Sequence, residues 1–201
     1  MEPDPLEEAV VPPEEATDPD RGTPFGAQVA EAALRFLDAG AIEVNGERFR
    51  MACSELVRAS LAAVGCTDGP PGSLGDGGTA SLHDYCEEAG ILHRDQPAPG
   101  DFILFDNTYD RNRNRKLDDP LSHVGVVVAV RDDGTVEFVH VGSGRVRRGH
   151  MNLDHPWSRK DRSGNPLNDQ LRRKTRNDPR KTRYMAGELF RTFCTPQPCG
   201  E

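Results

Sequence analysis

The chain has 201 residues, of which 35% are hydrophobic and 29% are charged, a composition typical of a globular domain with a full core. Its net charge of -8 comes from residues 1–20, which contain eight acids and no Lys or Arg, so the remainder is electrically balanced. The sequence has no run of eighteen apolar residues and no basic start followed by an apolar stretch. It therefore predicts neither a membrane span nor a signal peptide within this chain.

The chain divides into a tail and one domain. Residues 1–22 are acidic and proline-rich with too few bulky apolar residues to bury, so we expect them to be disordered. Residues 23–201 are long enough for a single domain with its own core. We expect that domain to be a monomer.

The first part of the domain is predicted to contain two helices and a hairpin. Thr23-Pro24 has the residues of a helix start, and Gly40 is placed to stop that helix. An Asn-Gly turn predicts a hairpin over residues 42–49. Apolar residues recur at helical spacing between Cys53 and Gly65, and Cys53 lies on the same face. This second helix therefore presents the cysteine at its N-terminus.

The later part is predicted to form a small antiparallel sheet. Three apolar runs read as strands, at residues 102–105, 123–130 and 135–141. An Asp-Gly turn closes the last two into a hairpin. The expected fold class is α+β, with this sheet packed against the N-terminal helix that carries Cys53.

Three other segments complete the chain. Ser81 caps a short helix that ends at Gly90. Residues 142–182 are polar and show no sustained period, which predicts a long functional or mobile loop. Residues 184–193 have apolar side chains at helical spacing and predict a final short helix.

The five cysteines are too few for a disulfide scaffold in a chain of this size. Their odd number leaves at least one thiol unpaired if all bridges are internal. Cys194 with Cys199, and Cys66 with Cys86, are candidate pairs. The sequence does not decide between these bridges and reduced core cysteines.

Cys53 is the candidate nucleophile. Unpaired N–H groups and the positive end of the helix dipole favour a thiolate at a helix N-terminus. Such a thiol needs a base and a third group that orients the base, and His123 and His140 are the candidates. Both fall on one face of the predicted hairpin, but a regular ladder leaves them about four residues, or roughly 13 Å, apart. A bulge or a strong twist is needed to join them.

Four motifs then follow one another along the chain. They are Cys53-Ser54-Glu55-Leu56-Val57, Pro99-Gly100-Asp101-Phe102-Ile103-Leu104-Phe105, His123-Val124-Gly125-Val126-Val127 and Phe138-Val139-His140. In order and spacing they resemble the motifs of the NlpC-type and CHAP cell-wall cysteine peptidases. The similarity spans most of residues 25–155.

The resemblance implies a papain-like core and a cysteine peptidase or amidase that cleaves peptide or amide bonds in bacterial peptidoglycan. It implies Cys53 as nucleophile, His123 as base and His140 as the residue that orients the base, with the Cys53 N–H in an oxyanion hole. This chemistry requires no cofactor. It also implies an extracytoplasmic location, periplasmic or secreted, with export encoded elsewhere.

The chain departs from the family patterns close to the nucleophile. Ala52 stands where NlpC-type enzymes usually have Asp, and Ser54-Glu55 stand where they have Ser-Gly. The long interval from His123 to His140 is closer to the CHAP pattern, in which the third residue is usually acidic or an amide. Two alternatives stay open: a non-catalytic wall-binding module on the same fold, and a thiol acyltransferase whose acyl-enzyme is resolved by an amine or alcohol.

Half of a calcium loop precedes His123. Five residues occupy its positions 1, 3, 5, 7 and 9, where oxygen side chains and one backbone carbonyl are required: Asp110, Asn112, Asn114, Lys116 and Asp118. Arg115 replaces the usual Gly and Leu121 replaces the final Glu. The segment predicts a structural calcium ion, with a solvated polar turn as the alternative.

Residues 145–191 contain fourteen Lys and Arg against five acids. They lack the aromatic interleaving and the fold signatures of nucleic-acid-binding proteins, so we expect no nucleic-acid partner. Attraction to an anionic cell-wall polymer, or a solvated surface, explains the charge equally well. The expected partner is the peptide part of peptidoglycan.

Overall fold

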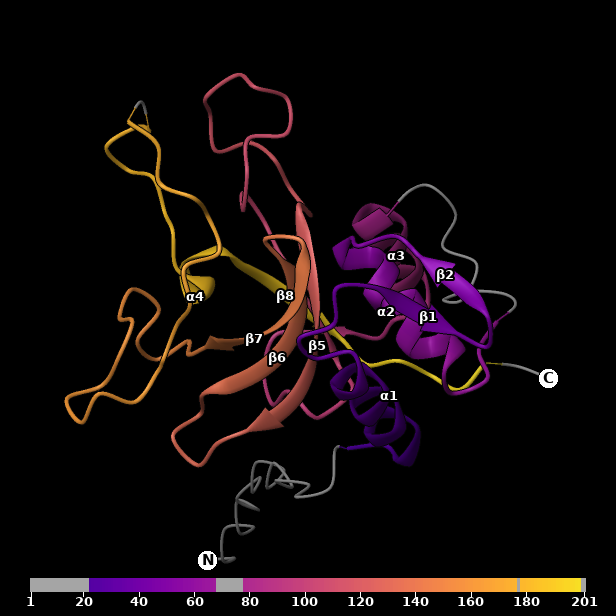
Figure 1. Ribbon diagram of the computed structural model, residues 1–201. Coiled ribbons are helices and arrows are strands. Elements are labelled where there is room, and N and C mark those ends of the chain that lie inside the picture. Colours follow the sequence, from indigo (N-terminus) through magenta and orange to yellow (C-terminus); the bar gives the residue numbers. More distant parts are fainter. Residues whose placement is uncertain (1–21, 68–77, 177, 200–201) are drawn as a thin grey trace, which may run out of the picture.

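The computed structural model describes residues 22–67, 78–176 and 178–199 (Figure 1). All but one residue of the predicted tail lie outside these ranges. The helices are α1 (Pro24–Arg35), α2 (Cys53–Ala62), α3 (Gly78–Glu88) and α4 (Ala186–Leu189). The strands are β1 (Ile42–Val44), β2 (Glu47–Phe49), β3 (Leu92–His93), β4 (Phe102–Phe105), β5 (His123–Val130), β6 (Val136–Gly142), β7 (Arg145–Met151) and β8 (Phe190–Cys194).

Six strands form one antiparallel sheet in the order β3-β8-β4-β5-β6-β7, and β1 and β2 form a separate hairpin. The helix that carries Cys53, α2, packs against β5 and β6. The predicted α+β class is therefore confirmed. No helix among the described residues is long and apolar enough to cross a membrane.

The sheet separates two hydrophobic clusters. The helix-side core joins α1 and α2 to sheet residues such as Val124 and Val126. The far-side core contains Phe105, Phe138 and Phe193 together with residues of α4. Figure 1 shows α1, α2 and α3 on one side of the sheet, and α4 with the long connections of residues 152–176 and 178–185 on the other. Alternation along each strand assigns neighbouring side chains to opposite cores.

The start of the first helix and the hairpin form as predicted, whereas α1 ends at Arg35, before the Gly40 that was expected to stop it. Thr23 caps α1, because its Oγ1 accepts a hydrogen bond from Gly26 N at 2.8 Å, and Pro24 is the first helical residue. The β1–β2 turn has left-handed backbone at both central positions, with φ of 51° at Asn45 and 82° at Gly46. This is the conformation that an Asn-Gly hairpin requires.

Two predictions for the C-terminal part are wrong. Residues 142–182 contain strand β7, whose charged side chains face outward at the sheet edge and hide the apolar alternation. Residues 184–193 form the four-residue helix α4 and then most of β8, instead of one helix. β8 lies between β3 and β4 and is buried through Phe193 and Cys194, and this burial outweighs the helical spacing of its apolar residues.

The structure contains two disulfides, and neither is a pair suggested by the sequence. Cys66 bonds to Cys199 and Cys86 to Cys194, across sequence separations of 133 and 108 residues. Insertion of β8 into the sheet carries Cys194 to α3, a long-range event that spacing cannot reveal. Cys53 is the free cysteine of the described residues, as the odd count predicts.

We expect Cys86→Ala to lower the free energy of unfolding in urea by about 4 kcal/mol, because the bridge closes a loop of roughly a hundred residues. Cys194→Ala should have a similar effect, and the double variant should cost little more, since either change breaks the same bond. Cys53→Ala is the control and should leave the unfolding free energy nearly unchanged. Additive losses in the double variant would show that the bridge does not form.

Candidate functional site

Cys53 is the first residue of α2. Ala52 precedes it with extended backbone and offers no side-chain acceptor to the first N–H groups of the helix. The thiol is partly exposed at the margin of the helix-side core. Its Sγ lies 3.9 Å from Oγ1 of Thr79, on α3. The thiol therefore lies at an uncapped helix N-terminus, where unpaired N–H groups stabilise an anion.

A buried carboxylate lies two residues from the thiol. Glu55 is 4% exposed, and a negative charge here would oppose a thiolate at Cys53. Arg50 Nη2 and Arg58 Nη1 each lie 3.2 Å from Glu55 Oε1. These two guanidinium groups offset the carboxylate charge. Sequence reasoning did not identify this pairing, although Arg58 follows Glu55 at a helical i,i+3 spacing.

The structure joins the two predicted histidines. His123 is the first residue of β5 and His140 lies on β6. His123 Nε2 is 2.8 Å from His140 Nδ1, with the two rings perpendicular. The β5–β6 ladder shifts register between Val127 and Ala129. This irregularity is the bulge that the sequence required to bring the imidazoles together.

Aromatic rings and a glycine hold the pair in place. Phe105 lies against His123 and Phe138 against His140, with ring centroids 6.2 and 5.2 Å apart respectively. A Cβ at Gly125 would lie 2.8 Å from the Phe138 ring and 3.4 Å from His140 Cβ. The Gly of the His-Val-Gly motif is thus required by the packing of β6 against β5.

Burial keeps both imidazoles neutral. It lowers the pKa of His123 to about 3, and the neighbouring His140 lowers it further. Burial also lowers the pKa of His140 to about 4, with the charge of Asp169 opposing and that of Arg147 adding to the effect. Asp169, which His150 Nδ1 contacts at 2.8 Å, comes from the predicted irregular stretch and was not identified from the sequence.

Two neutral rings share one proton in the His123–His140 hydrogen bond. When His123 Nε2–H donates to His140 Nδ1, the Nδ1 of His123 carries a free lone pair. Within the described residues, His123 forms no other hydrogen bond. In this tautomer its Nδ1 can accept a proton, which is the role of a general base.

Cys53 is not hydrogen-bonded to either histidine within the described ranges. Val124 belongs to the helix-side core, whereas the ring of its neighbour His123 lies against Phe105 of the far-side core. The nucleophile is thus carried by α2 and the base by β5, two elements that pack against each other, while the His123 ring faces the other core.

Comparison with protein-family models, curated proteins and solved structures gives no match to this chain. The resemblance to cell-wall cysteine peptidases therefore rests on the quoted sequence motifs alone.

The predicted calcium-loop residues gather in the connection between β4 and β5. The Asp110 carboxylate accepts hydrogen bonds from Asn114 N at 3.1 Å and Arg115 N at 2.8 Å. The side-chain amides of Asn112 and Asn114 donate to Asp118. Arg115 has φ of 62°, the left-handed conformation for which calcium loops use Gly.

Three further details bear on ion binding in this loop. Lys116 N donates to Asn114 Oδ1 at 2.8 Å, so this oxygen already accepts a hydrogen bond from within the loop. Asp119 is 2% exposed and its Oδ2 is buried without a hydrogen-bond partner. The Asn112 and Asn114 amides would have to rotate to present oxygen instead of nitrogen to an ion.

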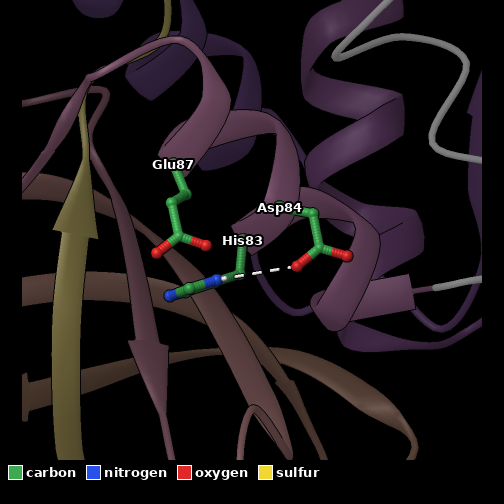
Figure 2. Close-up of side chains that lie close together, drawn as sticks. All are labelled: His83, Asp84 and Glu87. Carbon is green, nitrogen blue, oxygen red and sulfur yellow. Dashed lines mark ion pairs between the residues drawn. The ribbon is translucent and has the colours of Figure 1, made fainter.

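Figure 2 shows a second group of metal-ligand side chains, His83, Asp84 and Glu87, on one side of α3. Their ligand atoms lie within 4.8 Å of one another. His83 Nδ1 already lies 3.9 Å from Asp84 Oδ1, and all three residues come from one helix. A contact between the buried His83 and the exposed Asp84, with the exposed Glu87 one turn further on, accounts for the group without a metal.

Burial of the histidine pair predicts a pH-dependent stability. Because the folded pKa values lie near 3 and 4, below the ordinary 6.5, the stabilisation is complete above about pH 6.5 and is lost as pH falls toward 4. Each histidine contributes up to about 1.4 kcal/mol per pH unit in that window. Urea unfolding between pH 7 and 5 measures this slope. His140→Gln should reduce it, and a flat profile in the parent protein would contradict the buried neutral pair.

We expect the melting temperature to rise with free calcium, by mass action, as the ion replaces repulsion among the loop carboxylates. Asp110→Ala should abolish the response, whereas Asp84→Asn, in the group on α3, should preserve it. Differential scanning calorimetry with calcium and with chelator measures both. Identical melting under the two conditions would identify the loop as a polar turn.

Proposed function

We propose that the protein is a cysteine hydrolase that cleaves peptide or amide bonds, with the peptide part of bacterial peptidoglycan as its substrate. The observation that supports it most strongly is the 2.8 Å contact between His123 Nε2 and His140 Nδ1. It fixes the His123 ring and leaves Nδ1 as the basic nitrogen. Cys53, the free thiol, supplies the nucleophile at an uncapped helix N-terminus.

In the first step, His123 Nδ1 accepts the thiol proton as Cys53 Sγ bonds to the carbonyl carbon of the substrate. The carbonyl π pair moves to oxygen, and N–H groups at the start of α2 stabilise that charge. The C–N bond then breaks, and the amine leaves with the proton from His123. A thioester remains on Cys53.

In the second step, His123 removes a proton from water as the water oxygen attacks the thioester carbon. The C–S bond breaks, the sulfur recovers the proton from His123, and the acid product leaves. His140 accepts the His123 Nε2–H throughout, so it keeps the ring in the required tautomer. Atoms and protons balance without a cofactor.

This mechanism requires Cys53 Sγ and His123 Nδ1 to approach within hydrogen-bond distance when substrate binds. Catalytic hydrogen bonds are often long in free enzymes and tighten in the substrate complex. α2 packs on the strand that His123 begins, but the His123 ring lies against Phe105 of the far-side core. Substrate binding must therefore move the start of β5 or reorient the imidazole to bring the two atoms together.

The motifs that resemble NlpC-type and CHAP peptidases support peptidoglycan as the substrate. The two disulfides support an extracytoplasmic location, because such bonds persist mainly in oxidising compartments. A papain-like core is consistent with a cysteine helix packed on an antiparallel sheet.

One observation favours a second candidate, a non-catalytic wall-binding module: Cys53 contacts Thr79 and has no hydrogen bond to His123 within the described residues. Alkylation distinguishes the two candidates. A Cys53 that His123 activates should react with iodoacetamide at least tenfold faster in the parent protein than in His123→Ala, because the imidazole accepts the thiol proton as sulfur attacks. Equal rates in the two proteins would favour the binding module.

Digestion of purified peptidoglycan, followed by mass identification of the fragments, tests the proposed activity. Cys53→Ala should lower turnover by at least about a thousandfold and leave melting unchanged, and His123→Ala should be nearly as severe. His140→Ala should lose roughly tenfold less than His123→Ala, because an orienting residue contributes less than the base. Full turnover in Cys53→Ala would exclude the mechanism.

A further inference from the structure

A pocket of about 280 Å³ lies where the β4–β5 connection meets the segment before α4. Three arginines line it: Arg115 from the connection, and Arg172 and Arg173 from the later segment. The volume is at the low end for a ligand pocket and suits a small group. The residues come from parts of the chain that are far apart in sequence, so the fold itself assembles the pocket.

Arg172 is the unusual residue of this pocket. It is 5% exposed, and its Nη1 donates to the backbone oxygen of Asn107 at 2.7 Å. It forms no ion pair with an acid of the described ranges, and its other nitrogens form no hydrogen bond there. A buried guanidinium held by one carbonyl alone is costly unless an anion accompanies it.

The two acids that line the pocket already accept hydrogen bonds from other groups. Asp110 accepts the N–H groups of Asn114 and Arg115. Asp178 accepts Thr175 N and Thr175 Oγ1, each at 2.7 Å, and Tyr184 OH at 2.9 Å.

These hydrogen bonds, led by the one from Thr175 N and assisted by the charge of Arg172, hold the pKa of Asp178 below its usual range. Asp178 therefore offsets part of the Arg172 charge at a distance, without occupying its donors. Three guanidinium groups face two such carboxylates, which leaves the pocket with an excess of positive charge and unused N–H donors.

We propose that this pocket is a binding site for a small oxyanion of the carboxylate or phosphate type. The planar guanidinium fork matches both, since each presents two oxygens to paired N–H groups. Arg172 is the central ligand, and Arg173 and Arg115 complete the positive rim. The proposal does not rest on the proposed hydrolase activity, because the pocket shares no residue with Cys53, His123 or His140.

Calorimetric titration of the full chain at low ionic strength tests the site, with sodium phosphate and sodium acetate as separate probes. The unmodified protein should bind at least one of them saturably, with one site per chain. Arg173→Gln should weaken that binding at least fivefold. Arg176→Gln is the matched control, because it removes the same charge from the same segment outside the pocket, and it should stay within twofold of the unmodified protein.

Arg172→Lys keeps the positive charge but removes the paired N–H donors of the guanidinium, and we expect at least a tenfold loss of affinity for the anion. If this variant does not fold by circular dichroism, Arg173→Gln and the exposed Arg115→Gln decide the question. Tighter binding of phosphate identifies a phosphate-bearing ligand, and tighter binding of acetate identifies a carboxylate. Absence of saturable binding, or equal weakening by Arg176→Gln and Arg173→Gln, would overturn the proposal.

Discussion

The partly buried hydrogen bond between His123 and His140 is the contact on which the rest of the site depends. It exists because the β5–β6 ladder contains a bulge and because Gly125 leaves space for the Phe138 ring beside His140. Two imidazoles in contact are stable only while at most one proton lies between them, and burial ensures this by opposing protonation of both. Bulge, glycine and aromatic packing therefore act together to set the protonation state.

The sequence was sufficient for elements whose signals are local. Thr23-Pro24 begins α1, the Asn-Gly turn forms its hairpin, and the apolar runs become β4, β5 and β6. It was not sufficient for elements whose structure depends on burial against distant parts of the chain. The apolar residues of β8 recur at helical spacing, but the segment is a strand between β3 and β4, and this insertion also determines the disulfide partner of Cys86. At the site, the need for a bulge or a strong twist followed from the four-residue register gap between the histidines, whereas the influence of Asp169 on His140 depends on a tertiary contact.

The connection between β4 and β5 links several features that the sequence shows separately. Ser122 N donates to Phe105 O and its Oγ accepts Thr108 N, each at 2.9 Å, so the two ends of the connection are tied together directly before His123. Asn107 adds to these contacts at the root of the connection, because it pairs with Asp119 and its carbonyl accepts a hydrogen bond from Arg172. An ion in the loop or an anion at Arg172 would therefore act on this root, directly before β5 and its first residue, His123.

The electrostatic environments of Cys53 and His123 differ, and in the proposed reaction this difference determines when the proton moves from sulfur to the imidazole. Around Cys53, the helix N-terminus and the Arg50–Glu55–Arg58 group leave no uncompensated negative charge to oppose a thiolate. Around His123, burial disfavours the imidazolium that a resting thiolate–imidazolium pair would need. Proton transfer is then favourable only once the substrate carbonyl begins to take up the sulfur charge. In the proposed mechanism His123 therefore acts as a general base during attack, rather than as the cation of a preformed ion pair.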